Sequence, residues 1–241
     1  IMIQLNYLKI QGIRELRIIL QEGLDKNMSL QNELDYLNQL ILRMADIVLE
    51  NLHEAFDCYL NYDSSINYDD INDDIVDAKE RAIEEECINI MLRERPYSRD
   101  LRRVSGILKL VADLERLGDH AEDVMSFARK LENVERHQIT EINSMIDTAM
   151  SMVDDSIKSF VTGNVELARN VIDRDDIVDK KYDELIDTII SFTKKDDVSS
   201  KFAIYTTLVV KYIERIADHA VNISEWVVYI ESGYHKDKQI C

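Results

Sequence analysis

The chain has 241 residues, of which 47 are acidic and 29 basic, giving a formal net charge of −18. It contains only 6 Gly and 1 Pro, whereas average usage at this length gives roughly 17 and about 12. This shortage of turn residues excludes sandwiches, barrels and Rossmann domains, and it predicts an all-α protein. The charge disfavours nucleic acid and an anionic membrane surface as partners, and it favours cations or a basic protein surface.

The sequence lacks the usual marks of insertion into or export across a membrane. No apolar stretch reaches the roughly 18 residues of a membrane span, and no basic n-region or A-x-A-like cleavage site opens the chain. Cys58, Cys87 and Cys241 are far apart and form no CxxC motif, so we interpret them as two buried thiols and a tail thiol in a reducing compartment. We therefore expect a cytoplasmic protein without direct membrane insertion.

Three helices are expected in the first half of the chain. Apolar residues from Leu30 to Tyr59 recur at steps of three and four, which predicts one amphipathic helix. A second helix is expected from Asn67 to Glu94, because Pro96 cannot continue it. A third is expected to begin with Ser98 as its N-cap and to run to about Leu131.

Three more helices are expected in the second half, near residues 138–161, 164–193 and 199–232, with Gly233 ending the last. Three long antiparallel helices form a bundle, so we predict two tandem three-helix bundles. The predicted units are a first repeat at 28–134, a second repeat at 135–233 and a tail at 234–241. Residues 1–27 are interpreted as an amphipathic extension, as upstream sequence from a mis-called start, or as the end of a larger protein.

Two motifs recur in the same order and indicate one unit written twice. DDIVD occupies residues 73–77 and recurs at 175–179, 102 residues later. The motif ER-x-x-DHA occupies residues 115–121 and recurs at 214–220, 99 residues later. Chance is a poor explanation for two ordered matches at nearly the same offset, so the sequence predicts an internal repeat.

The repeated motifs place carboxylates four residues apart, on one face of a helix. The four pairs are Asp73 with Asp77, Glu115 with Asp119, Asp175 with Asp179, and Glu214 with Asp218. Facing pairs on neighbouring helices bring four carboxylates together, and oxygen donors of this kind suit Mg²⁺, Ca²⁺, Mn²⁺ or iron. A solvated acidic face is the alternative interpretation of each row.

Other residues give weaker indications. His120 and His219 point away from the acidic pairs and are interpreted as packed or capping imidazoles rather than ligands. Glu50 and His53 form a single E-x-x-H motif without the partner that a di-iron enzyme bundle needs. Trp226 lies in an apolar final helical turn and is expected to pack on the other bundle or in a dimer contact.

The segments RERPYSRDLRRVSGILKLVADLERLGDHAEDV (93–124) and KYIERIADHAVNISE (211–225) resemble the paired signatures of the PhoU phosphate-signalling family. The resemblance covers about residues 28–233. It implies two similar three-helix bundles that bind multinuclear clusters of iron or zinc, with manganese or magnesium as further candidates. The family's metal motifs fall on Asp73, Asp77, Glu115, Asp119, Asp175, Asp179, Glu214 and Asp218.

The resemblance also implies a function and partners. Members of this family are cytoplasmic regulators rather than enzymes, and they often form homodimers. They link the ATPase of the phosphate ABC transporter to a PhoR-type sensor histidine kinase. They repress the phosphate-starvation response when phosphate is plentiful, and they limit phosphate uptake.

Two departures and two alternatives accompany this resemblance. Arg95 and Pro96 stand where the family has QP, and Lys180 and Lys181 interrupt the acidic row of the second repeat, where the first has Ala78 and Lys79. We therefore expect occupancy of the second site to be the less complete. The alternative functions are a cytosolic PhoU-like domain of a sodium/phosphate cotransporter and a metal-dependent hydrolase, although no nucleophile or general base stands out.

Overall fold

A computed structural model describes residues 30–61, 74–135, 137–195, 198–236 and 238–239. This part of the chain is almost entirely helical. Its helices are α2 (Leu30–Asn61), α3 (Asp74–Glu94), α4 (Ser98–Lys130), α5 (Thr140–Thr162), α6 (Val165–Asp173), α7 (Asp175–Lys194) and α8 (Ser200–Ser232). The all-α prediction is confirmed.

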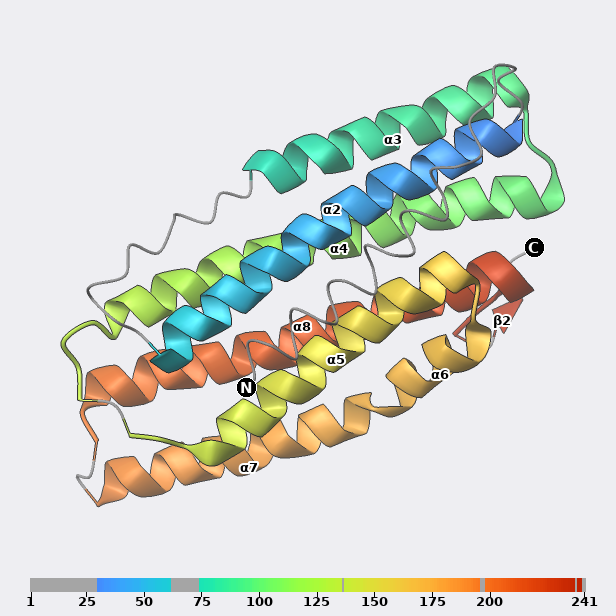
Figure 1. The fold of residues 1–241 in the computed structure, drawn as a ribbon. Helices are drawn as coiled ribbons and strands as arrows, with labels where there is room; N and C mark the ends of the chain where they lie inside the picture. The colour runs from blue at the N-terminus through green and yellow to red at the C-terminus, as the bar shows by residue number, and fades with distance from the viewer. Residues whose placement is uncertain (1–29, 62–73, 136, 196–197, 237, 240–241) are drawn as a thin grey trace.

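The helices form two three-helix bundles that lie side by side (Figure 1). The first contains α2, α3 and α4, and in the second the successive helices α6 and α7 together take one position beside α5 and α8. The most extensive contact between any two described helices joins α4 to α8, which occupy the middle of the molecule. Each repeat therefore contributes its last helix to the contact between the bundles.

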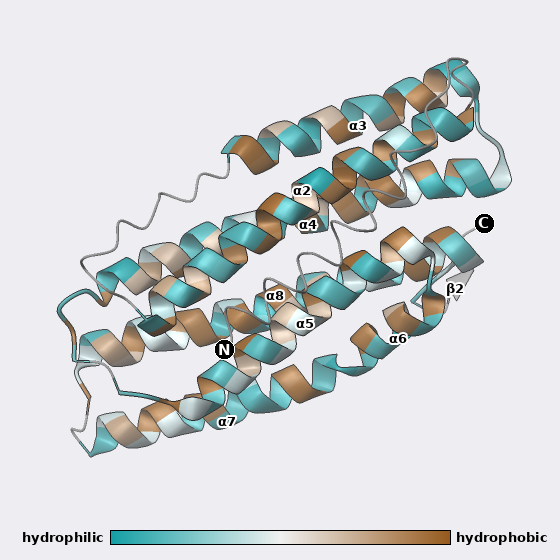
Figure 2. Cartoon of the chain, viewed as in Figure 1, coloured by the Kyte–Doolittle hydropathy of each residue, from teal (hydrophilic) through white to brown (hydrophobic). Residues whose placement is uncertain are grey.

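Apolar stripes on the helices build one continuous core across both bundles. Brown apolar and teal hydrophilic positions alternate around each helix in Figure 2, as amphipathic helices require. The predicted stripe of the first helix is buried at Leu37, Met44 and Leu52. Each buried aliphatic side chain of this size contributes about 1.5–3 kcal/mol of transfer free energy, so the core supplies most of the stability.

Several predicted boundaries match the structure. Helix α3 ends at Glu94, shortly before Pro96, and α8 ends at Ser232, followed by Gly233 in the left-handed conformation (φ 84°) as its C-cap. Cys58 and Cys87 are buried free thiols, and burial raises the pKa of Cys87 to about 12. The predicted extension at 1–27, the predicted start of the second helix at 67–73 and Cys241 lie outside the described residues.

The prediction that Ser98 caps α4 is wrong. Ser98 has φ 42°, whereas an N-cap residue needs extended backbone to place its side-chain oxygen over the first turn. Tyr97 is the N-cap instead, and its side chain makes no capping bond. Side-chain caps occur in the second repeat, where Asn164 accepts from the Leu167 N–H (3.0 Å) and Ser199 from the Phe202 N–H (3.1 Å).

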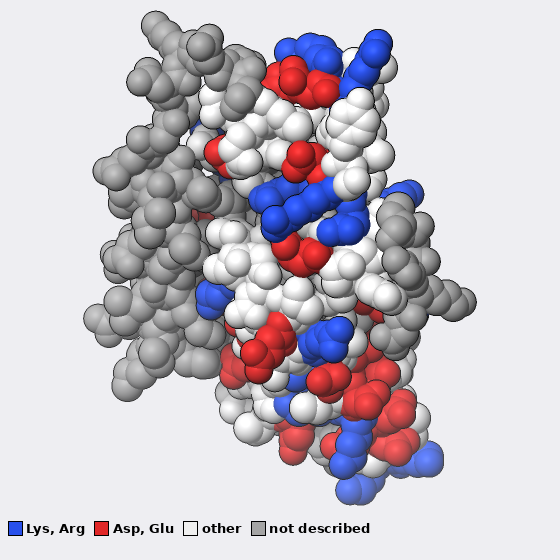
Figure 3. All heavy atoms as spheres, turned by 90° about the vertical axis from the view of Figure 1, so that its right-hand side faces the viewer, with Lys and Arg blue, Asp and Glu red and all other residues white. Residues whose placement is uncertain are grey.

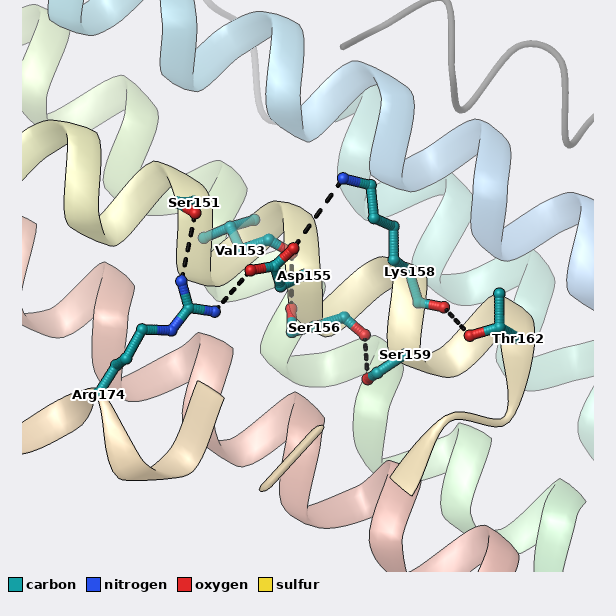
Figure 4. A network of polar contacts seen from close by, with 8 residues as sticks. All are labelled: Ser151, Val153, Asp155, Ser156, Lys158, Ser159, Thr162 and Arg174. Atoms are coloured by element: carbon teal, nitrogen blue, oxygen red, sulfur yellow. Dashed lines mark hydrogen bonds and ion pairs between the residues drawn. The ribbon is translucent and has the colours of Figure 1, made fainter. Parts of the chain in front are cut away.

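The prediction of a single helix over 164–193 is also wrong, because the chain breaks at Arg174 into α6 and α7. The Arg174 N–H bonds to the carbonyl of Val171, three residues back, which tightens the turn. Its guanidinium reaches across to α5, where Nη2 lies 2.7 Å from Asp155 Oδ2 and Nη1 lies 3.2 Å from Ser151 Oγ (Figure 4). This contact between helices accompanies the break and has no signal in the local sequence.

Close backbone approach and arginine contacts hold the end of α8 against the start of α4. A Cβ added at Gly106 would lie 2.4 Å from Ile230 Cγ1, so only glycine fits there without displacement. Arg102 Nε donates to the Ile230 carbonyl (2.9 Å), and Arg99 pairs with Glu231 (3.2 Å). Figure 3 shows this end of the molecule, where basic side chains form a band with acidic side chains on both sides.

A short hairpin follows α8, a feature that the helical composition did not predict. Strand β1 (Tyr234–His235) pairs antiparallel with β2 (Lys238–Gln239). Trp226 stacks on His235 of this hairpin, with ring centroids 4.0 Å apart and an interplanar angle of 11°. The expected contact with the other bundle is made by Ile230, which faces Gly106. None of the described helices is long and apolar enough to span a membrane.

We expect Gly106→Ala to destabilise the protein. In an unhindered helix this change stabilises by about 0.5–1 kcal/mol. Here the new Cβ overlaps Ile230, so we expect a net loss of about 1–3 kcal/mol in the free energy of unfolding, measured by urea denaturation. Ile230→Ala as a background should abolish the penalty, and a gain in stability from Gly106→Ala alone would contradict the close contact.

Candidate metal centre

A first group of acidic side chains lies where α3 packs on α4. We call Asp77 and Glu80 of α3 together with Glu115 and Asp119 of α4 the first carboxylate cluster. Burial, together with the charges of Asp119, Glu80 and Asp77, raises the pKa of Glu115 to about 6 against the opposing effect of Arg116. The two predicted acidic rows therefore face each other closely enough to share one electrostatic field.

A glycine allows this approach of α3 to α4. A Cβ at Gly118 would lie 3.0 Å from Val76 Cγ1, which is tighter than ordinary van der Waals contact. Gly118 directly precedes Asp119, and Val76 directly precedes Asp77. The Val76 side chain therefore packs closely on the α4 backbone at Gly118, directly beside the acidic side chains.

One arginine lies on the first cluster. Arg116 Nη1 is 2.6 Å from Asp119 Oδ2, and its Nε is 3.4 Å from Glu115 Oε2. The Arg116 side chain is 58% exposed, so water screens much of its charge. The pKa of Glu115 stays raised despite this cation, which means that the negative charges and burial outweigh it.

A second group of acids occupies the matching place between α7 and α8. The second carboxylate cluster consists of Asp175 and Asp179 of α7 with Glu214 and Asp218 of α8. Burial, together with the charges of Asp218, Asp179 and Glu214, raises the pKa of Asp175 to about 6. Burial and the neighbouring Glu214 and Asp179 also raise the pKa of Asp218.

The donor set of both clusters fits a hard or borderline cation. All donors are carboxylate oxygens, and their mutual repulsion is relieved by a bound positive charge. Asp175 Oδ1 is buried and has no hydrogen-bond partner among the described residues, whereas most buried polar atoms in proteins have one. As the side chains stand, the described ranges contain no group of three or more His, Cys, Asp or Glu placed so that it could hold a metal ion.

Seven of the eight predicted ligands thus belong to these two clusters, and Asp73 lies outside the described residues. The lysines expected to disturb the second cluster point elsewhere. Lys181 Nζ donates to Ser144 Oγ (2.7 Å) on α5, and Lys180 pairs with Glu184 (3.7 Å) one turn along α7. Occupancy of the two sites stays a prediction.

The repeated histidines meet at the contact between the bundles. His120 is buried, neither of its ring nitrogens has a partner among the described residues, and burial lowers its pKa to about 4. Its ring centroid lies 5.1 Å from that of His219, whose Nδ1 is 2.9 Å from Asp113 Oδ1. The interpretation of His120 as a packed imidazole is confirmed.

Comparison of the two repeats could not have found Asp113. Its counterpart 99 residues later is Tyr212, so the position carries no repeat signal. Asp113 Oδ1 also accepts a hydrogen bond from Asn222 Nδ2 (3.1 Å). Asp113 therefore joins α4 to α8 through two polar contacts that only the fold reveals.

Known proteins agree with this architecture. The family model for the PhoU domain matches the chain twice, at residues 41–128 and 142–227. The chain belongs to the PhoU family. One match lies in each bundle, so the repeat seen in the sequence corresponds to two PhoU domains.

Curated relatives are matched along most of their length. The phosphate-specific transport system accessory protein PhoU homolog of Clostridium acetobutylicum is 30% identical over 210 residues, covering 86% of this chain and 96% of the relative. The homolog of Aquifex aeolicus is 34% identical over 208 residues, covering 86% and 94%. Both relatives carry the same name, which describes them as accessory proteins of phosphate transport.

Solved structures of the family share the fold. The crystal structure of PhoU from Pseudomonas aeruginosa has a TM-score of 0.79 and 28% identity, covering 86% of this chain and all of that one. The phosphate transport system regulatory protein PhoU from Streptococcus pneumoniae also has a TM-score of 0.79, at 28% identity and 87% coverage of this chain. The predicted pair of three-helix bundles is therefore confirmed.

We expect the metal-free protein to respond to pH through Glu115. Between its ordinary pKa of 4.5 and about 6, folded Glu115 binds more protons than unfolded Glu115, so this residue lowers the free energy of unfolding as pH rises. Glu115→Gln removes that effect. Its stability relative to the parent protein should rise by about 1 kcal/mol across this window.

The measurement is chemical denaturation at several pH values after chelator treatment. Glu85→Gln, at an exposed position of α3 outside the cluster, is the control. A stability difference between Glu115→Gln and the parent protein that does not change with pH would contradict the raised pKa.

Proposed function

We propose that this protein is an accessory and regulatory protein of phosphate-specific transport. Membership of the PhoU family carries this proposal, because the domain matches once in each bundle. The relatives that the chain covers almost completely are named as accessory proteins of that system. One structural neighbour is named as its regulatory protein. This agreement favours the accessory role over the cotransporter-tail alternative.

The proposed mechanism is that of an adaptor in the cytoplasm. The protein binds the ATPase subunit of the phosphate ABC transporter and a PhoR-type sensor kinase. Through these contacts it represses the phosphate-starvation response and limits uptake when phosphate is plentiful. It acts by binding rather than by catalysis, and we expect it to work as a homodimer.

Metal binding at the carboxylate clusters belongs to the same proposal. Each cluster holds a multinuclear site of iron or zinc, with manganese or magnesium as further candidates. Two facing acidic rows in each repeat and the unpartnered Asp175 Oδ1 support it. The proposed ligands are Asp73, Asp77, Glu115, Asp119, Asp175, Asp179, Glu214 and Asp218. The bound metal supplies positive charge that offsets the repulsion between the carboxylates.

Removal of metal should lower thermal stability, since a ligand that binds only the native state stabilises it. We expect metal-loaded protein to melt at a higher temperature than chelator-treated protein. A combined Glu115→Gln and Asp175→Asn variant should lose most of that difference, with Glu85→Gln as the matched control. Elemental analysis of the same samples reports bound iron and zinc. Equal melting temperatures and no bound metal in the parent protein would contradict a structural metal.

The adaptor role predicts specific partners in the protein's own host. Tagged protein recovered from cells grown at high phosphate should bring down the transporter ATPase or the sensor kinase, identified by mass spectrometry. Purified ATPase subunit should then bind the purified protein directly. Recovery of neither partner with well-expressed, folded protein would contradict the adaptor role. It would shift support to the cotransporter alternative.

A further inference from the structure

The two carboxylate clusters hold different side-chain cations, although their acidic motifs are the same. Glu214, Arg215 and Asp218 correspond to Glu115, Arg116 and Asp119 at an offset of 99 residues. At the same offset Lys211 corresponds to Ala112. The second repeat therefore has a lysine one turn before its motif, where the first repeat has no charge.

Lys211 lies directly on the second cluster. Its Nζ is 2.6 Å from Glu214 Oε2 and 5.0 Å from the ring centroid of Tyr182 on the facing helix α7. Although burial alone would lower it, the hydrogen bond to Glu214 raises the pKa of Lys211. The ammonium is therefore held between α7 and α8 by a carboxylate on one helix and an aromatic face on the other.

The arginine of the second motif is used elsewhere. The Arg215 guanidinium lies 5.4 Å from the ring centroid of Tyr212, and the Tyr212 hydroxyl donates to Asp123 of α4. In the first motif, by contrast, Arg116 binds Asp119 and Glu115. A basic side chain therefore contacts each cluster, but the two come from different positions of the repeat: Arg116 in the first and Lys211 in the second.

Arg116 and Lys211 differ in how easily their charged groups move away from the carboxylates that they contact. Arg116 pairs within one helix and is 58% exposed, so it rotates into water at little cost. Lys211 is 38% exposed and also contacts Tyr182 across the helix contact. A metal that binds Glu214 through Oε2 must displace the Lys211 ammonium, and one that binds through the other carboxylate oxygen is repelled by this nearby positive charge.

We propose that Lys211 is a built-in cation of the second cluster that competes with metal for Glu214, so that the first cluster binds metal more tightly and fills first. This inference rests on the proposed metal function and specifies its order of occupancy. Lys211 offsets the charge of Glu214, whereas Asp175 Oδ1 has no partner among the described residues, so the second cluster still offers one oxygen that Lys211 does not occupy.

A reciprocal exchange tests the role of Lys211. Chelator-treated full-length protein is titrated with Zn²⁺ by calorimetry at pH 7, and the wild type should show a tight and a weak class of sites. Lys211→Met keeps the apolar stem and should tighten the weak class about tenfold. Ala112→Lys should weaken the tight class by a similar factor, with Ala112→Met as the control for size. Glu115→Gln assigns the tight class to the first cluster.

A second measurement applies whether or not Zn²⁺ binds. In metal-free protein, Lys211→Met should lower the melting temperature because a cation is lost from the second cluster, and Ala112→Lys should raise it. Ala112 is exposed on α4, so added bulk there does not disturb the core.

The outcomes separate the two proposals. Zn²⁺ binding with both classes unchanged in Lys211→Met and Ala112→Lys would overturn the competition and leave the metal function standing. No Zn²⁺ binding to any variant would overturn the metal function. In that case, an unchanged melting temperature for metal-free Lys211→Met would also overturn the built-in cation.

Discussion

The contact between α4 and α8 is the constraint on which the rest of the molecule depends. Each of these helices supplies half of one carboxylate cluster on its outer flank and half of the contact between the bundles on its inner flank. Gly106 allows Ile230 to approach at one end, and Asp113 binds His219 further along. If α4 slid along α8, the contact between the bundles would change, and so would the distance between the two clusters.

Repulsion within the carboxylate clusters lowers the free energy of unfolding, and burial of the apolar core offsets this loss. Like charges four residues apart cost a few tenths of a kcal/mol per pair, and the raised pKa values of Glu115 and Asp175 show that burial adds to this cost. A single buried leucine offsets several such pairs, at about 1.5–3 kcal/mol. Arg116 and Lys211 relieve part of the repulsion. Both clusters nevertheless keep a surplus of negative charge, and this surplus is one reason for our proposal that they bind external cations.

The two copies of the acidic motif have different surroundings in the folded protein. Arg116 lies on its own cluster, whereas the corresponding Arg215 lies over Tyr212. The counterpart of Asp113 is Tyr212, so the two sides of the contact between the bundles are chemically different as well. The two repeats share their acidic motifs but differ in the neighbouring side chains, and this difference is the basis of our proposal that the two clusters differ in their affinity for metal.

The sequence by itself determined the helical class, most helix ends, the internal repeat and seven acids that the structure brings into two clusters. These follow from local rules: apolar spacing, Pro96, Gly233 and carboxylates four residues apart. Only the tertiary structure decided the contact of Arg174 with Asp155 at the break between α6 and α7, the approach of Tyr182 to Lys211, and the use of Asp113 at the contact between the bundles. Those features depend on side chains that meet from different helices, and no local pattern records which helices become neighbours.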